Sequence, residues 1–152
     1  MNKLSKGDVA VNGLLPKLTQ FINDSWRTAQ EGSETAYRDS LVRCLRDSVP
    51  EDCRVEREYR HAGTTVDIYI SWKGILSSDE VFIEMKRDLQ KKATFDRLIG
   101  QLEELDPEKH KIILVLIGKT DEGLLGRLKS RYEKFITRHL SSGGTMAIIV
   151  KS

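Results

Sequence analysis

Three consecutive segments alternate between apolar and polar residues, and this pattern restricts the fold more than any other feature of the sequence. Alternation with a period of two is typical of a strand with one buried and one exposed face. Turn-forming stretches near 61–63 and 73–78 separate the segments, so the sequence predicts a three-stranded antiparallel meander. The predicted strands are residues 54–60, 64–72 and 79–86, and in the second of them Val66, Ile68, Ile70 and Trp72 share one face.

Apolar residues at helical spacing lie on both sides of this meander. A near-continuous apolar run at 112–117 predicts a strand that is covered on both faces, and 145–150 predicts a short last strand. This order of elements predicts an α/β fold, in which helices flank a mixed sheet. The predicted helices are residues 14–26, 33–48, 93–105 and 121–140, and residues 1–13 are expected to be a polar, frayed end.

The length of 152 residues favours one domain. Residues 33–118 are expected to form its core, with the order α-β-β-β-α-β. We expect 1–32 to be an N-terminal extension with a helix, and 119–152 to add a C-terminal helix and strand.

Composition excludes several classes of protein. No apolar run approaches the ~18 residues of a membrane span, so no membrane partner is expected. The net charge of +2 excludes a strongly basic protein that coats DNA. The two cysteines, Cys44 and Cys53, cannot form a disulfide framework. We therefore expect free thiols and a cytoplasmic protein, with a Cys44–Cys53 bridge as the alternative.

Two acidic residues in the predicted hairpin of 64–72 and 79–86 point to metal chemistry. Asp67 and Glu84 lie in otherwise apolar strands, where a charge is costly unless it is paired, exposed or bound to something. A loop centred between residues 75 and 76 would place the two carboxylates opposite each other, with Cβ atoms about 5 Å apart. Like charges at that distance are destabilising unless a cation lies between them.

A divalent cation between these carboxylates would have suitable ligands. Two carboxylates, the backbone carbonyl of Met85 and waters make a good Mg²⁺ or Mn²⁺ site. Lys86 lies two residues after Glu84, on the same face, where it could orient or deprotonate an attacking water or stabilise charge on a phosphate. The alternative is a hairpin with a solvated outer face, in which Lys86 pairs with one of the acids. A shift of one residue in the loop would remove the opposition.

At this point the residues resemble a known family. The stretch Val66-Asp67-Ile68-Tyr69-Ile70, followed after a gap by Val81-Phe82-Ile83-Glu84-Met85-Lys86, is similar to the PD-(D/E)xK nuclease superfamily. That group includes restriction endonucleases and archaeal Holliday-junction resolvases, and its α-β-β-β-α-β core matches 33–118 in order. The resemblance implies a restriction-endonuclease-like fold, with Asp67 and Glu84 as metal ligands and Lys86 as the catalytic lysine. Val66 stands where the name of the superfamily expects proline.

The resemblance implies two further site residues and an oligomeric state. Many members carry a Glu in the helix before the first core strand, and Glu34 is the candidate metal ligand here. Many carry a Gln in the helix after the third strand, which Gln101 resembles. The alternatives are that Glu34 only favours the helix dipole and that Gln101 is a surface amide. Small members often dimerise, so a homodimer is implied, for which the 14–26 helix offers a surface.

Basic residues gather immediately after the proposed site. Residues 86–97 hold five basic and two acidic side chains, which is a local net charge of +3. Such groups would neutralise nucleic-acid phosphates and make binding salt-dependent, and the alternative is an ordinary solvated loop. The candidate nucleic-acid-binding residues are Arg87, Lys91, Lys92 and Arg97, together with Arg57 and Arg60 on the neighbouring first strand.

These observations leave three hypotheses about function. The first is a metal-dependent phosphodiester hydrolase that acts on DNA. The second is a catalytically inactive domain of the same fold that binds nucleic acid or a protein. The third is an unrelated α/β interaction module, for which the 14–26 helix would be a docking or dimer surface. Metal-dependent nicking of DNA would separate the first from the other two.

Overall fold

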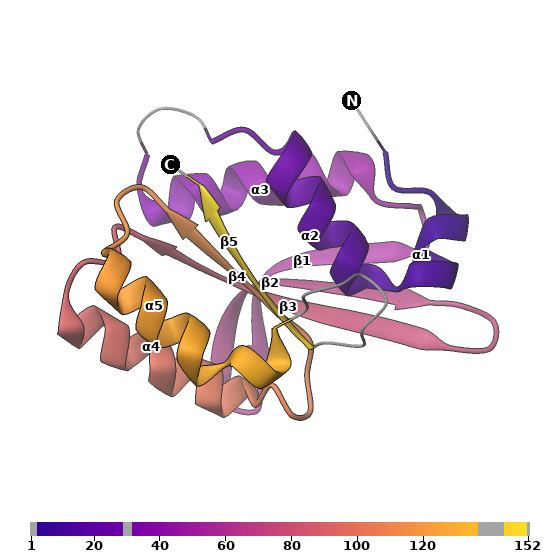
Figure 1. Cartoon of the computed structure of the whole chain (residues 1–152). Helices are drawn as coiled ribbons and strands as arrows, with labels where there is room; N and C mark the ends of the chain where they lie inside the picture. The colour runs from indigo at the N-terminus through magenta and orange to yellow at the C-terminus, as the bar shows by residue number, and fades with distance from the viewer. Residues whose placement is uncertain (1–2, 29–31, 137–144, 152) are drawn as a thin grey trace.

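The centre of the molecule is a mixed sheet of five strands in the order β1-β2-β3-β4-β5 (Figure 1). The computed structural model describes residues 3–28, 32–136 and 145–151. Neighbouring strands are antiparallel from β1 to β3 and parallel from β3 to β5. The strands are β1 (Cys53–His61), β2 (Thr64–Lys73), β3 (Ser78–Arg87), β4 (Ile112–Ile117) and β5 (Met146–Lys151).

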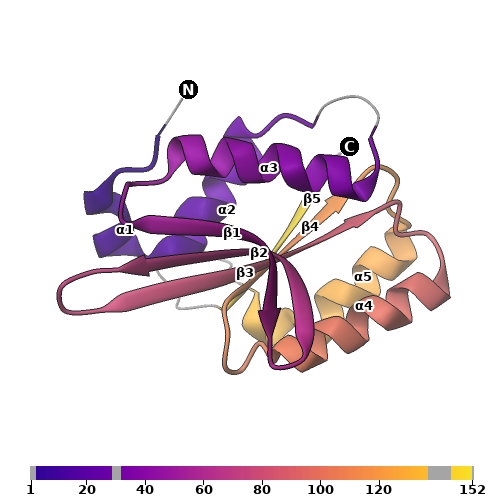
Figure 2. The same cartoon turned by 180° about the vertical axis from the view of Figure 1, so that it is seen from behind.

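Helices cover both faces of this sheet (Figures 1 and 2). One face carries α1 (Lys6–Asn12), α2 (Leu14–Ser25) and α3 (Glu34–Ser48), and the other carries α4 (Lys92–Leu105) and α5 (Glu122–Arg131). Parallel neighbours need a crossover connection, and α4 and α5 lie in the two crossovers of β3-β4-β5. The predicted α/β class is therefore confirmed, and the arrangement is consistent with a restriction-endonuclease-like core.

Strand β4 separates two hydrophobic cores. All six of its residues are buried, as its unbroken apolar run predicts. Alternate side chains face opposite sides of the sheet. Ile113, Val115 and Ile117 pack with α2 and α3, whereas Ile112, Leu114 and Leu116 pack with α4 and α5.

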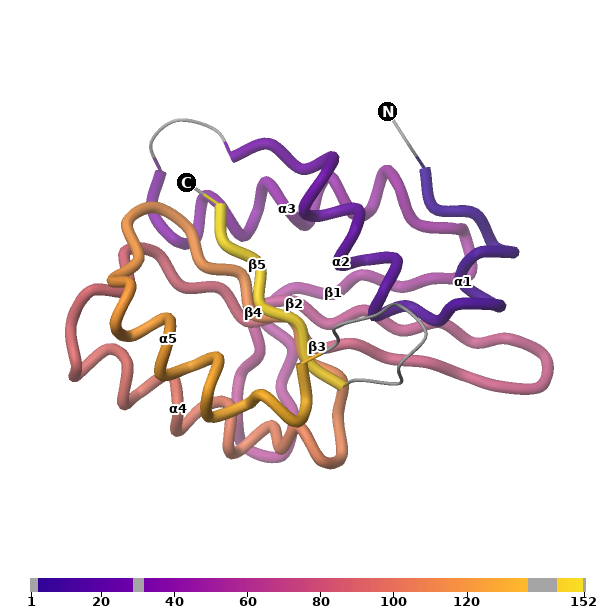
Figure 3. Tube along the Cα trace, viewed as in Figure 1, coloured from indigo at the N-terminus to yellow at the C-terminus, as the bar shows by residue number. Residues whose placement is uncertain are grey.

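The last strand is tied to the first half of the molecule. Strand β5 lies against α2 (Figure 3). The Lys151 ammonium donates hydrogen bonds to the carbonyl oxygens of Asn23 at 2.6 Å and Trp26 at 2.9 Å. These carbonyls belong to the C-terminal end of α2, where a lysine commonly satisfies groups that have no partner in the helix.

The N-terminal region is more ordered than expected. Residues 1–13 were predicted to be a frayed end, but α1 spans Lys6–Asn12 within them. Ser5 caps this helix by accepting a hydrogen bond from the Asp8 N–H, and Leu4 N–H donates to the Ser48 carbonyl at the end of α3. A helix of seven residues with one buried side chain, Val9, leaves little periodic signal in the sequence.

The predicted helix 121–140 is also wrong in its length. Helix α5 ends at Arg131, and a 3₁₀ turn follows at Glu133–Phe135. Ile136 then forms a parallel bridge with Met146, and Thr145 N–H donates to the Phe135 carbonyl. Pairing with the start of β5 has therefore overridden the helical spacing. Residues 137–140 of the prediction lie outside the described part of the chain.

The apolar face of α2 is not available for docking. Leu14, Leu15, Leu18, Phe21 and Ile22 are all buried in the core that α2 shares with α3 and the sheet. The interaction-module hypothesis, which needed this face as a docking or dimer surface, is therefore wrong on that point. The implied homodimer stays a prediction that must use another surface.

Two expectations from composition can be compared with the structure. Cys44 and Cys53 are both free, so the alternative of a bridge between them is wrong. Within the described ranges, every helix is too short or too polar to cross a bilayer.

We predict that Gly118→Ala destabilises the protein by about 1–3 kcal/mol, because φ at this residue is +74°, where only glycine is unstrained. An added Cβ would also lie 2.3 Å from Asp88 Oδ1. Gly126→Ala is the matched control, since a Cβ there meets nothing within 4 Å, and it should stabilise α5 by up to ~1 kcal/mol. Urea unfolding measures both, and equal effects of the two substitutions would contradict this account.

Candidate functional site

The β2–β3 ladder stops in the middle of the sheet. Ile68 faces Ile83 and Trp72 faces Asp79, as a loop centred between residues 75 and 76 requires. The predicted register is therefore confirmed. The last described pair of this ladder is Ile68 with Ile83, although β3 continues to Arg87 beside β4. Strands β2 and β3 thus separate immediately before Asp67 and after Ile83.

Two carboxylates take over where the backbone ladder ends. The next hydrogen-bonded pair of a continuing ladder would be Met85 with Val66, but Met85 N–H instead donates to Asp67 Oδ2 at 2.9 Å. Asp67 N–H in turn donates to Glu84 Oε1 at 3.2 Å. Buried backbone donors need such partners, and here side chains supply them. The geometry brings Asp67 and Glu84 together, as the hairpin register predicted.

Strand β1 shows a matching irregularity. Arg57 pairs with Ile68 and Tyr59 with Val66, but the described ladder has no pair between Glu58 and Asp67. Glu58 has φ +52°, in the left-handed region that is unfavourable for residues other than glycine. The pairing of β2 is therefore interrupted at Asp67 on both of its edges: at Glu58 of β1 and after Ile83 of β3.

This interruption explains a wrong prediction. Val66 was expected on the same face as Ile68 and Ile70. The structure instead packs Val66 in the core with α4, while Ile68 and Ile70 belong to the core with α2 and α3. The tip of the β1–β2 hairpin consequently turns toward α4, where Thr64 hydrogen-bonds to Glu104.

Burial strongly affects the two carboxyl groups. Glu84 is 2% exposed, and Asp67 is partly buried. Burial, together with the charge of Asp67, raises the pKa of Glu84 to about 8. Burial also raises the pKa of Asp67, against the opposing effect of its hydrogen bond from Met85. The alternative of a hairpin with a solvated outer face is therefore wrong for Glu84.

Helix α3 brings a third carboxylate to this place. Ser33 caps α3, and Glu34 occupies its first turn. Glu34 Oε2 accepts a hydrogen bond from Arg87 N–H at 3.0 Å, and Glu34 Oε1 lies 3.9 Å from Lys86 Nζ. The charge of Glu34 also raises the pKa values of both Asp67 and Glu84. The printed sequence identified Glu34 only through the resemblance, and the structure gathers it with Asp67, Glu84 and Lys86.

This group lies at one end of the parallel part of the sheet. The start of α3, the end of β3 and the start of α4 are on the same side of the molecule in both views (Figures 1 and 2). Ligands of open α/β sheets commonly bind beyond the carboxyl ends of the strands. Both the position of this group in the sheet and its side-chain chemistry therefore suit a binding site.

Sequence reasoning missed Arg38 of α3. This residue is 9% exposed, and its guanidinium donates to Glu58 Oε1 at 2.9 Å. Its positive charge, like that of Lys86, lowers the pKa of Asp67. One signal could have found it: Arg38 lies four residues after Glu34 and on the same stripe of α3 as the buried Leu41 and Leu45.

Gln101 is not joined to this group by any described hydrogen bond. It lies in α4, and its Oε1 atom is buried with no hydrogen-bond partner in the described part of the chain. A buried polar atom without a partner is uncommon and favours a role with a ligand or water. The surface-amide alternative is wrong for this atom, whereas the implied catalytic role stays a prediction.

The predicted basic residues are solvent-accessible. Arg87 ends β3, and Lys91 is the N-cap residue of α4. Lys92 pairs with Asp96, and Arg57 donates to Asp39 Oδ1 at 2.9 Å, so part of this charge is already neutralised. The exposed residues of the set are Arg57, Arg60, Arg87, Lys91, Lys92 and Arg97.

The donor atoms at the group can be compared with what a metal requires. In the described residues, no three or more His, Cys, Asp or Glu side chains form a ready-made metal cage. Mg²⁺ rarely needs one, because it keeps several waters and uses one or two carboxylates. Met85 N–H points at Asp67, and the N–H and C=O of one strand residue point the same way, so its carbonyl faces the gap between β2 and β3. Asp67, Glu84 and this carbonyl could therefore hold Mg²⁺ or Mn²⁺.

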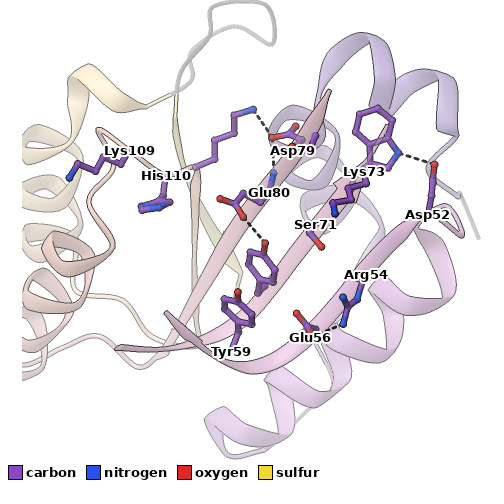
Figure 4. Close-up of a pocket in the computed structure, with 14 residues that line it drawn as sticks. Asp52, Arg54, Glu56, Tyr59, Ser71, Lys73, Asp79, Glu80, Lys109 and His110 are labelled. Carbon is purple, nitrogen blue, oxygen red and sulfur yellow. Dashed lines mark hydrogen bonds and ion pairs between the residues drawn. The ribbon is translucent and has the colours of Figure 1, made fainter. Parts of the chain in front are cut away.

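A separate cavity of about 720 Å³ lies along β1, β2 and β3 toward the turn that joins β2 to β3 (Figure 4). Residues from these strands and from the loop before β4 line it, including His110. Its charges are largely paired internally, since Lys111 binds Asp79 at 2.8 Å and Arg54 binds Glu56 at 3.1 Å. The predicted site residues do not line this cavity.

Comparisons with known proteins add one structural likeness. No family model and no curated protein matches the chain. Among solved structures, the chain is similar to Pyrococcus furiosus SfsA, solved in complex with Ca²⁺, with 15% identity and a TM-score of 0.42. The match covers 77% of this chain and 55% of the SfsA chain, so it spans little more than half of that protein.

We predict that the metal-free protein becomes less stable as pH rises from about 4.5 to about 8. Glu84 ionises near 4.5 when unfolded and near 8 when folded, so the native state binds more protons in this window, and the free energy of unfolding falls with pH. Glu84→Gln removes the titrating group and keeps an oxygen for Asp67 N–H, so it should flatten the dependence. Thermal melts in chelator at several pH values measure this. A wild-type stability that rises through the window would contradict it.

Proposed function

We propose that the chain is a divalent-metal-dependent phosphodiester hydrolase that acts on DNA. The observation that carries this proposal is the pair of carboxylates, Asp67 and Glu84, held beside each other by backbone hydrogen bonds at the point where β2 and β3 separate. Burial and mutual repulsion oppose the ionisation of the two carboxyl groups, so a positive charge between them would stabilise their ionised forms. A divalent cation would supply that charge.

Each residue of the group has a role in this proposal. Asp67, Glu84 and the Met85 carbonyl hold Mg²⁺ or Mn²⁺, and Glu34 adds negative charge beside them. When bound, the ion supplies positive charge that polarises the phosphodiester. The Lys86 ammonium, which lies 3.9 Å from Glu34, donates hydrogen bonds that orient the attacking water or stabilise charge on the phosphate oxygens.

Exposed basic residues would bind the DNA backbone. Arg87, Lys91 and Arg97 follow the group directly along the end of β3 and the first turns of α4. Arg57 and Arg60 lie on β1. We infer that these side chains place a phosphodiester at the carboxylates by neutralising neighbouring phosphates. We also infer that the chain acts as one domain, in which 33–118 carries the site.

The first functional prediction concerns three substitutions in the site. Asp67→Asn, Glu84→Gln and Lys86→Met should each lower metal-dependent cleavage by about 100-fold or more, because each removes a charge on which the reaction depends. Asn and Gln keep an oxygen for Met85 N–H and Asp67 N–H, so these two variants should remain folded. Nicking of supercoiled plasmid with Mg²⁺ and with Mn²⁺ measures activity, and thermal melts confirm folding.

Glu80→Gln is the matched control for these variants, since Glu80 lies four residues before Glu84 on the same strand and hydrogen-bonds to Tyr69. It should cleave like the wild type. Cleavage that survives in the Glu84 variant would contradict the mechanism. Salt-dependent DNA binding by a wild type that never cleaves would select the catalytically inactive alternative.

The second functional prediction concerns DNA affinity. Lys91→Ala and Arg97→Ala should each weaken DNA binding and reduce the slope of log affinity against log salt by about 1, because each side chain neutralises a phosphate. Lys129→Ala on α5 is the control and should leave the slope unchanged. Fluorescence anisotropy over a salt series measures the slope. Equal slopes for all three variants would show that the DNA lies elsewhere.

A further inference from the structure

A chain of ion pairs joins α3 to β1 beside the proposed site. The Arg38 guanidinium lies 2.9 Å from Glu58 Oε1 and 3.3 Å from Asp39 Oδ1. Arg57 donates to the same Asp39 oxygen at 2.9 Å. Arg38 is the deeply placed member, with a side chain that is 11% exposed, whereas the Glu58 side chain is 56% exposed.

Two energetically unfavourable features coincide at these ion pairs. A largely buried arginine must be compensated for the loss of its hydration. Glu58 also holds a left-handed backbone conformation, with φ +52°, that costs energy in a residue other than glycine. Strained and buried polar residues of this kind cluster at functional sites.

Both features lie next to Asp67. Glu58 stands opposite Asp67 in the register of β1 and β2, at the one position where their described ladder is interrupted between Arg57 and Tyr59. An uninterrupted ladder would pair Asp67 N–H with β1, but this N–H donates to Glu84 instead. The bend at Glu58 therefore accompanies the turn of Asp67 toward Glu84.

We propose that Arg38 is a positioning residue for the metal site: by holding Glu58 in its bent conformation, it keeps Asp67 turned toward Glu84. This inference rests on the proposed function, because it assigns the purpose of the Arg38–Glu58 pair to metal binding. The competing explanation is that Arg38 only attaches α3 to β1. In that case, loss of any other link between α3 and β1 should affect metal binding to the same extent.

The chain contains a matched control for that explanation. Arg46 lies two turns further along α3 and also binds β1, donating to the Val55 carbonyl at 3.1 and 3.2 Å. It therefore provides a second arginine link between the same helix and the same strand, away from Asp67.

The experiment measures Mn²⁺ affinity by calorimetry in the full chain without DNA. Arg38→Gln and Glu58→Ala should each weaken Mn²⁺ binding about 10–100-fold, as loss of residues that orient metal ligands does. Glycine adopts a positive φ without strain, so Glu58→Gly needs no contact to hold the bend and should bind Mn²⁺ more tightly than Glu58→Ala. The double variant should bind no more weakly than the single ones, because both remove one interaction. Arg46→Gln should bind Mn²⁺ like the wild type.

The outcomes separate the two proposals. Wild-type Mn²⁺ affinity in the Arg38 variant, or equal weakening by Arg46→Gln, would overturn the positioning role and leave the proposed function standing. Absence of Mn²⁺ binding by the wild type would overturn the proposed function and this inference with it. Glu58→Ala changes a half-exposed side chain, so it tests the same contact if the Arg38 variant does not fold.

Discussion

Two hydrogen bonds, in which a carboxylate replaces a strand carbonyl as the acceptor, allow the central sheet to open at the candidate site. Asp67 accepts from Met85 N–H, and Glu84 accepts from Asp67 N–H, where the β2–β3 ladder has ended. The sheet can open at this place without leaving buried donors unpaired. Structure and chemistry therefore depend on the same atoms, and an aliphatic residue at either position would disturb both.

Charge around these atoms is poorly balanced in the protein alone. Three carboxylates meet one lysine and one arginine, and most of them are partly or fully removed from water. Lys86 and Arg38 offset part of the repulsion, since each lowers the pKa of Asp67. Burial is the main cause of the raised pKa values of both central acids, and the neighbouring cations do not cancel it. Unfavourable electrostatics of this kind are typical of sites that bind a cation or do chemistry.

Local patterns predicted the parts of the structure that depend on neighbouring residues. Alternation gave the strands, and the symmetric loop predicted that Asp67 and Glu84 would meet. The contact of Glu34 with Lys86 depends on how α3 docks, which no spacing encodes, so the resemblance was needed to single it out. Val66 was misplaced because strict alternation assumes an uninterrupted strand, and the strain at Glu58 leaves no periodic signal. The end of α5 was decided by pairing with β5, which outweighed helical spacing, and α1 was missed because seven residues with one buried side chain leave little periodic signal.

The link between Lys151 and the end of α2 has a consequence for how the chain folds. Lys151 is separated from Asn23 by 128 residues and from Trp26 by 125 residues, so these contacts form only after the long intervening chain has been made. The apolar face of α2 packs in the core to which Ala147 and Ile149 of β5 contribute. Contacts between such distant segments slow folding, because a long loop must close before burial rewards it. On the ribosome, α2 would therefore be made well before β5, the strand that completes its core, and would wait for it while the intervening chain is synthesised.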